Sequence, residues 1–422
     1  MKIAFETKDR ELLACWKWAT ERALACVRDD APVGPCYEAA LPDRHAFCMR
    51  DMAHQAVGAH YLGLDRHNRN MLYRFAENIS EARGFCSFWE ITFDGTPCPA
   101  DYQNDGHFWY NLPANFDVMR TASELTELTG DRFYLYDETM ARFHMLTVGP
   151  YIEKWDHDGD GIVDRGDSHS TRGICSYDES TCGGYRYALD TYALQYRALR
   201  IGAKLSLESG NTEKASRLSA SADLLARDFA GKFWMPEEEH LASVIGKDGT
   251  RGGGFTVTKA VFPLREGLLP ASFVEKQLDY AQKGAKEINI EEQTYLAEVL
   301  FSAGRDEEAR AVLSGLCRPE TKRRDYPEVS FTVVGDIVRG YMGLCPAASD
   351  EKIVTRFGGD AQDSAVLYDA PVFDGTVTLS HEGRSKSILQ NDTGREILWE
   401  ARLAGGTVRR RLAAGERAAA SL

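Results

Sequence analysis

The chain has 422 residues, of which 43% are hydrophobic and 27% charged, and it carries a net charge of −14. These totals are typical of a globular protein in water, and helical toroids of this length fold as single units. Lysine and arginine form no run longer than three residues, as at Arg409–Arg411. Nucleic acid is therefore excluded as a partner, since neutralising phosphates needs clustered cations. We expect a neutral or weakly charged ligand.

The sequence predicts no membrane segment. Its first residues, MKIAFETKDRELL, lack an apolar core of signal-peptide length, and no window approaches 18 uninterrupted apolar residues. Ten cysteines are scattered without a CxxC pair or a spacing suited to zinc, so we expect most of them to be reduced and packed. We expect a cytoplasmic protein; the alternative is a secreted chain whose signal peptide has been removed.

Apolar residues recur at helical spacing through most of the chain, which predicts about twelve helices. Some are amphipathic, and others are apolar round most of their circumference, which is typical of inner helices. The amphipathic or more polar helices are expected near 12–27, 68–82, 132–155, 215–233, 270–284 and 306–316. The apolar ones are expected near 46–62, 113–128, 255–264, 291–303 and 328–344, together with a sixth helix of roughly 20 residues at the end of the stretch from Trp155 to Arg200. This alternation predicts an all-α fold, a closed (α/α)6 toroid of six helical hairpins over residues 1–348.

The character of the sequence changes near its end. From Lys352 onward, Val, Thr and Ile alternate with polar residues, and the pairs Asp374-Gly375, Glu382-Gly383 and Asn391-Asp392 interrupt them. Such alternation and such dipeptides indicate strands joined by hairpins. We therefore predict that residues 349–422 form a small β-rich appendage on the helical body.

Acidic and aromatic residues collect just before each predicted inner helix. If the inner helices run parallel round an axis, these loops open at one end and form a concave, acidic pocket. The positive ends of the helix dipoles would stabilise carboxylates there. The groups are Arg50-Asp51, Trp89-Glu90 with Asp105-Gly106-His107, Asp178-Glu179, Gly252 to Gly254, Glu291-Glu292, and Tyr326-Pro327-Glu328.

The stretch before the sixth helix, WDHDGDGIVDRGD, has the spacing of a twelve-position calcium loop. Its predicted ligands are Asp156, Asp158, Asp160, the backbone carbonyl of Ile162, and Asp167. The last ligand is Asp where such loops usually have Glu, which reaches farther and binds through two oxygens. A solvated acidic turn, shaped by its glycines, is the alternative.

The sequence resembles the six-hairpin (α/α)6-barrel glycosidases. The segments DHDGDGIVD, SYDES and GGY are similar to bacterial β-glucosidases of the glucosylceramidase-like family, and QNDGHFW followed by TGD is similar to glucoamylases. Arg50-Asp51 looks like the pair that grips substrate in that superfamily. The β-rich end after the barrel resembles the arrangement in α-L-rhamnosidases.

The resemblance implies a hydrolase that cleaves the terminal glycosidic bond of an oligosaccharide, with inversion of configuration. In such enzymes one carboxyl group protonates the leaving oxygen while a second activates water. The acid lies in the loop that enters the sixth helix, which matches Asp178 or Glu179. The base lies at the start of the twelfth, which matches Glu328. The Tyr-Asp pair favours Asp178, but Ser180 stands where the glucosidases have tryptophan, so Glu179 stays open.

The substrate-binding residues that we expect are Arg50, Asp51, Trp89, Glu90, Asp105, His107 and Trp109. Each has a structural alternative, namely a buried ion pair, a helix cap or an aromatic core. Two other functions also stay open. A sugar epimerase on the same toroid would use histidines facing the axis, for which His45, His54, His60 and His107 are candidates. A carbohydrate-binding protein without catalysis would need no opposed carboxylates.

Overall fold

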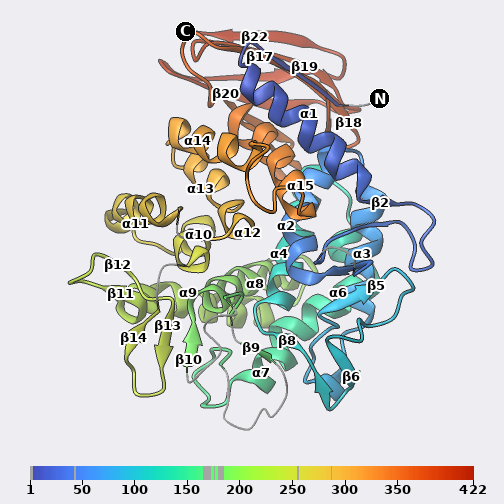
Figure 1. Ribbon diagram of the computed structural model, residues 1–422, viewed down its shortest axis with the longest axis vertical. Helices are drawn as coiled ribbons and strands as arrows, with labels where there is room; N and C mark the ends of the chain where they lie inside the picture. The colour runs from blue at the N-terminus through green and yellow to red at the C-terminus, as the bar shows by residue number, and fades with distance from the viewer. Residues whose placement is uncertain are drawn as a thin grey trace.

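The computed structural model describes residues 3–41, 44–164, 173–174, 176–178, 185–253, 256–286 and 288–422. Helices make up the body of the molecule, and two larger β-sheets lie together at one end (Figure 1). Both ends of the chain lie at this β-rich end (Figure 1).

Six helices, which we call the inner helices, contact one another in sequence. They are α2 (Met49–Tyr61), α4 (Ala114–Thr129), α8 (Leu189–Glu208), α10 (Val257–Arg265), α13 (Leu296–Ser302) and α15 (Pro327–Asp336). Each contacts the next along the chain, α13 through the π-helical turn η4 (Ile337–Tyr341) that continues α15, and α15 contacts α2. The apolar character of these segments agrees with their burial, since every described position of α15 is buried.

A second set of helices packs beside the inner ones. These are α1 (Arg10–Ala25), α3 (Asp65–Glu77), α6 (Glu138–Leu146), α9 (Thr212–Phe233), α11 (Ala271–Gly284) and α14 (Asp306–Cys317). Side chains cap several of them: Asp9, Asp137 and Asn211 each accept a backbone N–H in the first turn of α1, α6 and α9. Each predicted helix therefore has a counterpart in the structure.

Two of the predicted helices are divided. The fifth consists of α5 (Phe133–Tyr136), α6, a π-helical turn η2 (Thr147–Tyr151) that contains Pro150, and α7 (Ile152–Trp155). Proline lacks an N–H group for the helical ladder, which accounts for the irregular turn. The short helix α12 (Ile290–Gln293) precedes α13, and 3₁₀ turns occur at η1 (Glu81–Arg83) and η5 (Ala348–Asp350).

Two inner helices approach each other closely at Gly58. A Cβ atom added to this residue of α2 would lie 1.9 Å from the carbonyl oxygen of Phe331 in α15. The two helices can pack at this distance only because glycine has no side chain.

The β content is larger than the small appendage that we predicted. A five-stranded sheet has the order β1-β17-β18-β19-β22, and a four-stranded sheet has the order β15-β16-β20-β21. Their strands are β1 (Ala4–Thr7), β15 (Leu344–Ala347), β16 (Lys352–Arg356), β17 (Ser364–Val372), β18 (Gly375–Glu382), β19 (Lys386–Asp392), β20 (Ile397–Leu403), β21 (Gly406–Leu412) and β22 (Arg417–Ser421).

The prediction of an almost purely helical fold was therefore wrong in its β content, for two reasons. The larger sheet takes β1 from the first residues of the chain, where Ala4 pairs with Tyr368 in antiparallel register, and such long-range pairing leaves no local signal. The loops also form short strands of their own: β2 (Val27–Arg28), β3 (Cys36–Tyr37), β4 (Ala46–Cys48), β5 (Glu90–Thr92), β6 (Tyr102–Asn104), β7 (His107–Phe108), β8 (Tyr110–Asn111), β9 (Gly173–Ile174), β10 (Tyr185–Ala188), β11 (Trp234–Met235), β12 (His240–Leu241), β13 (Val244–Gly246) and β14 (Arg251–Gly252). The domain boundary at residues 348–349 stays a prediction.

Among the described residues, none of the helices combines the length and the apolar character that crossing a bilayer requires.

Candidate active site

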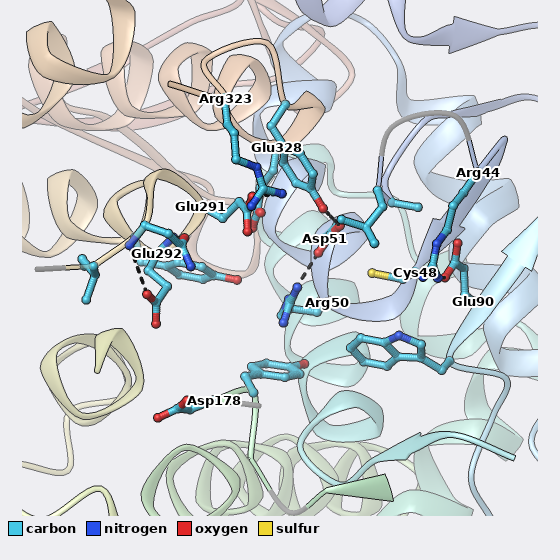
Figure 2. A pocket seen from close by; sticks show the side chains of 18 of the residues that line it. Arg44, Cys48, Arg50, Asp51, Glu90, Asp178, Glu291, Glu292, Arg323 and Glu328 are labelled. Atoms are coloured by element: carbon cyan, nitrogen blue, oxygen red, sulfur yellow. Dashed lines mark hydrogen bonds and ion pairs between the residues drawn. The ribbon is translucent and has the colours of Figure 1, made fainter. Parts of the chain in front are cut away.

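The acidic and aromatic loops of the inner helices line one pocket of about 650 Å³. Its lining includes residues from the first turn or the preceding loop of each of the six inner helices (Figure 2). Arg50 and Asp51 belong to the first turn of α2, and Glu328 to the first turn of α15. The N-terminal ends of these helices stabilise the negative charge of the carboxylates.

The structure brings most of the predicted site residues together. Those that line the pocket are Arg50, Asp51, Trp89, Glu90, Trp109, Asp178 and Glu328. Asp105 and His107 do not: Asp105 bonds to Arg83 at 2.5 Å and to the Tyr102 hydroxyl at 2.9 Å, and His107 lies half-buried in β7. Glu179 lies outside the described residues. The roles of all of these residues stay predictions.

Glu328 and Asp51 are almost fully buried at the wall of the pocket. Both side chains are about 1–2% exposed. Arg50 donates from Nε to Asp51 Oδ1 at 3.2 Å, and the Tyr326 hydroxyl donates to Asp51 Oδ2 at 3.2 Å. Burial raises the pKa of Glu328 well above the usual range, the charge of Asp51 adds to this effect, and Arg50 opposes it.

Asp178 lies across the pocket from Glu328 (Figure 2). Its segment is held from two helices: the Tyr177 N–H donates to Asp190 of α8 at 2.6 Å, and the Tyr177 hydroxyl donates to Asp117 of α4 at 3.0 Å. Burial raises the pKa of Asp190 to about 7. Asp178 itself is buried, with 8% of its surface exposed. Two buried carboxyl groups therefore set the position of the predicted acid.

Glu90 belongs to a second group of charges at the pocket wall. Arg44 donates to Glu90 at 2.5 Å and to Asp101 at 3.1 Å. Burial, assisted by Asp101, raises the pKa of Glu90 to about 7, although Arg44 opposes the shift. A carboxyl group with this pKa holds or releases a proton near neutral pH, so Glu90 has the electrostatics of an alternative acid.

The acidic pair before α13 has different environments. Glu292 forms a capping box with Asn289, because the Glu292 N–H donates to Asn289 Oδ1 at 2.9 Å and the Asn289 N–H donates to Glu292 Oε2 at 3.3 Å. Glu291 lies 2.5 Å from Arg323, whose φ of +64° is uncommon for a residue other than glycine. Burial raises the pKa of Glu291, although the charge of Arg323 opposes this shift.

Three of the predicted calcium ligands lie together outside this pocket. One carboxylate oxygen from each of Asp156, Asp158 and Asp160 lies within 4.8 Å of the others. The Asp156 carboxylate accepts the backbone N–H groups of Gly159, Asp160 and Gly161, and the Arg186 guanidinium contacts Asp158. Oxygen donors of this kind suit calcium. Asp167 lies outside the described residues, so calcium stays a prediction.

The sequence did not single out several residues of the pocket wall. Arg44 pairs with Glu90, Arg323 pairs with Glu291, and Tyr295 adds to the aromatic lining. Arg323 and Tyr295 lie close in sequence to residues that were singled out, Glu328 and Glu292, so distance along the chain was a usable signal. Arg44 gave none, because its partner Glu90 is 46 residues away.

No family model and no curated protein sequence matches the chain. Solved structures do match it in fold. The α-L-rhamnosidase from Dictyoglumus thermophilum matches with a TM-score of 0.69 and 15% identity, over 99% of this chain and 50% of that one. A putative kojibiose phosphorylase from the human microbiome matches with a TM-score of 0.64 and 8% identity, over 100% and 63%.

A third match is a rhamnosidase from Klebsiella oxytoca with rhamnose bound, with a TM-score of 0.55 and 14% identity, over 80% of this chain and 65% of that one. The chain thus spans about half to two thirds of the length of these structures. The predicted resemblance is confirmed at the level of the fold: the chain has the fold of the six-hairpin glycosidases.

Proposed function

We propose that the protein is a glycoside hydrolase that removes a terminal sugar from an oligosaccharide or glycoside. The observation that carries this proposal is the pocket in which Glu328 and Asp178 lie on opposite walls among aromatic side chains (Figure 2). Glycosidic bond cleavage needs two carboxyl groups, one to protonate the leaving oxygen and one to activate water or attack the sugar. The fold, shared with rhamnosidases, supports the same reaction class.

The proposed architecture is a closed (α/α)6 toroid. The contacts between successive inner helices support it, together with the contact between α15 and α2, which joins the last of them to the first. In a ring of this kind the N-terminal ends of the inner helices surround one mouth, where the pocket residues would meet.

In the proposed mechanism, Glu328 is the base and Asp178 or Glu179 the acid. Arg50 and Asp51 bind sugar hydroxyls, and Trp89 and Trp109 provide apolar faces for a sugar ring. Glu90, with its pKa near 7, is the alternative acid. We propose inversion of configuration, which requires a separation of roughly 6.5–9.5 Å between the two carboxyl groups to leave room for water.

We also propose that calcium at Asp156, Asp158 and Asp160 stiffens the loop that leads to Asp178, and that the protein acts in the cytoplasm.

The alternatives make different demands on the pocket. An epimerase of the kind considered above needs a histidine that reaches the sugar, and among the described residues none of those lining the pocket is a histidine. His60 is fully buried and hydrogen-bonded to Asp65. His54 contacts Glu328 but does not line the pocket. This arrangement favours the hydrolase.

A screen of chromogenic monosaccharide glycosides tests the proposal, with rhamnosides and glucosides as the first substrates. We expect one glycoside to release its chromophore with wild-type protein and not with Glu328→Gln. Solvent proton exchange at a sugar carbon without release would instead identify an epimerase. Saturable sugar binding with neither release nor exchange would identify a binding protein.

A further inference from the structure

Glu328 has a polar partner that the proposed reaction does not include. The Nδ1 atom of His54 lies 2.5 Å from Glu328 Oε1, and the two side chains are 8% and 1% exposed. The His54 ring also stacks on Tyr295, with 3.5 Å between the ring centroids. Packing therefore holds the imidazole against one oxygen of the carboxyl group.

His54 lines a second cavity, which shares no lining residue with the pocket. This cavity has a volume of about 280 Å³ and is lined by His54 and by residues of the inner helices and of strands β15 and β16. Glu328 lines the pocket but not the second cavity, and His54 lines the second cavity but not the pocket. The imidazole thus lies between the carboxyl group of Glu328 and the second cavity.

The lining of the second cavity has more arginines than carboxyl groups, and each of these arginines is ion-paired. Five arginines and three carboxyl groups line it: Arg120, Arg265, Arg339, Arg356, Arg402, Glu124, Glu298 and Asp336. Burial raises the pKa of Asp336 well above the usual range. The Nη2 atom of Arg265 is buried and has no hydrogen-bond partner within the described part of the chain.

The charged groups that face His54 come from each helix packed round it. They are Glu328 of α15, Arg265 of α10, Glu298 of α13, and Asp117 and Arg120 of α4. Burial lowers the pKa of His54 to about 3, with Arg265 contributing, so the ring is neutral at neutral pH. A neutral imidazole carries one N–H, and its tautomer decides which nitrogen donates.

The two tautomers have opposite consequences for Glu328. With the proton on Nδ1, His54 donates to an ionised carboxylate, which can accept a proton from water. With the proton on Nε2, His54 presents a lone pair to Glu328, and the short contact then requires a protonated carboxyl group. Arg265 is the charged group with the largest effect on His54. Its positive charge favours a lone pair on Nε2 over an N–H, because the lone pair carries negative partial charge.

We propose that His54 is a positioning residue whose Nδ1–H tautomer, favoured by Arg265, holds Glu328 as an ionised base. This inference rests on the proposed hydrolase function. In the reaction, the attacking water forms its bond to the anomeric carbon and passes its proton to the other oxygen of Glu328. The bond to the leaving oxygen breaks as that oxygen takes a proton from Asp178 or Glu179. His54 keeps its proton throughout.

A pair of substitutions separates this role from packing. Asparagine places an N–H near the position of Nδ1, whereas leucine fills similar space without a donor. We expect His54→Leu to lower kcat roughly tenfold to a hundredfold, as for loss of a hydrogen bond to a charged group, with little change in KM. The rise of its kcat/KM with pH should have its midpoint at a higher pH than in the wild type, because Glu328 then ionises without the N–H donor. His54→Asn should keep most of the turnover and the wild-type pH profile, and His60→Asn on the same helix is the control for loss of a buried histidine.

A second measurement does not depend on activity. Nitrogen NMR of histidine-labelled protein reports the tautomer of each ring, and we expect His54 to carry its proton on Nδ1 between pH 6 and 8. Arg265→Gln should increase the fraction protonated on Nε2. An Nε2–H tautomer in the wild type, or identical pH profiles for the leucine and asparagine variants, would overturn the inference. If no glycoside is cleaved by the wild type, the proposed function fails, while the NMR result still decides the tautomer.

Discussion

At the scale of single residues, some of the side chains that line the pocket could be predicted from the sequence and others could not. Arg50, Asp51 and Glu328 were predictable because each stands in the first turn of an apolar helix, where a charged residue has no packing role. Asp105, predicted from its place in the loop before such a helix, pairs instead with Arg83 away from the pocket. Arg44 was not predictable as a site residue, because its partner Glu90 is 46 residues away. His54 was considered only as a histidine of an epimerase, since its partner Glu328 is 274 residues away.

Asp51 provides the first residue-scale prediction. Asp51→Asn should lower kcat/KM at least tenfold, because a hydrogen bond between a charged group and a sugar hydroxyl is worth about 1.5–3 kcal/mol. The fold should survive, since asparagine has the same shape and can still accept the Tyr326 hydroxyl. Steady-state kinetics and circular dichroism measure both quantities. Unchanged kinetics would show that the Arg50–Asp51 pair is only structural.

The second residue-scale prediction concerns the two catalytic carboxyl groups. Glu328→Gln, and either Asp178→Asn or Glu179→Gln, should each lower turnover by about 10²–10⁴-fold. Because burial raises the pKa of Glu328, this base ionises at a higher pH than an ordinary glutamate, so kcat/KM should rise with pH above the usual glutamate range. Proton NMR of the first product should show inverted configuration. Turnover that survives both acid-side substitutions would make Glu90 the next acid to test.

At the scale of elements, apolar periodicity predicted the helices well. It placed α2, α4, α8 and α15 as inner helices because a segment that is buried on all sides must be apolar on all sides. The same reasoning could not predict how close two helices approach. That depends on single small residues, and Gly58 is identifiable only when Phe331 is seen beside it.

The contact at Gly58 leads to an element-scale prediction. Gly58→Ala should destabilise the protein by about 1–3 kcal/mol or more, because α2 and α15 must move apart to admit the methyl group. Gly231→Ala is a matched control: Gly231 lies in α9, and a Cβ atom added there would meet no other atom within 4 Å, so alanine should stabilise the protein by about 0.5–1 kcal/mol through helix propensity. Thermal unfolding measures both. Equal effects of the two substitutions would contradict the close packing of α2 and α15.

The acidic loop after α7 gives a second element-scale prediction. If Asp156, Asp158 and Asp160 bind calcium in the folded state alone, saturation at a hundred times the dissociation constant adds about 2.7 kcal/mol of stability. EDTA should therefore lower Tm, and calcium should restore it. Asp156→Asn should abolish this difference, while Asp248→Asn, an exposed aspartate of another turn, should leave it unchanged. An identical Tm with and without chelator would mean that the loop is an acidic turn.

At the scale of the whole molecule, the first residues of the chain connect the helices to the sheets. Strand β1 pairs with β17, which lies near the other end of the sequence. Phe5 of this strand is 4% exposed and lies with its ring centroid 5.6 Å from Trp16 of α1 and 6.0 Å from Tyr341 of η4. One side chain therefore joins the β-sheet, an outer helix and the end of the last inner helix.

Phe5→Ala should accordingly weaken the β-rich end and the helical body together. The cavity it leaves should cost about 3–5 kcal/mol, as for other buried phenylalanines, and Tm should fall in a single transition if the two parts unfold as one. Tyr368→Ala, on the neighbouring strand but 36% exposed, should change the free energy of unfolding far less, by about 0.5 kcal/mol. Two separate transitions in Phe5→Ala, observed by calorimetry, would show instead that the sheets form an independent domain.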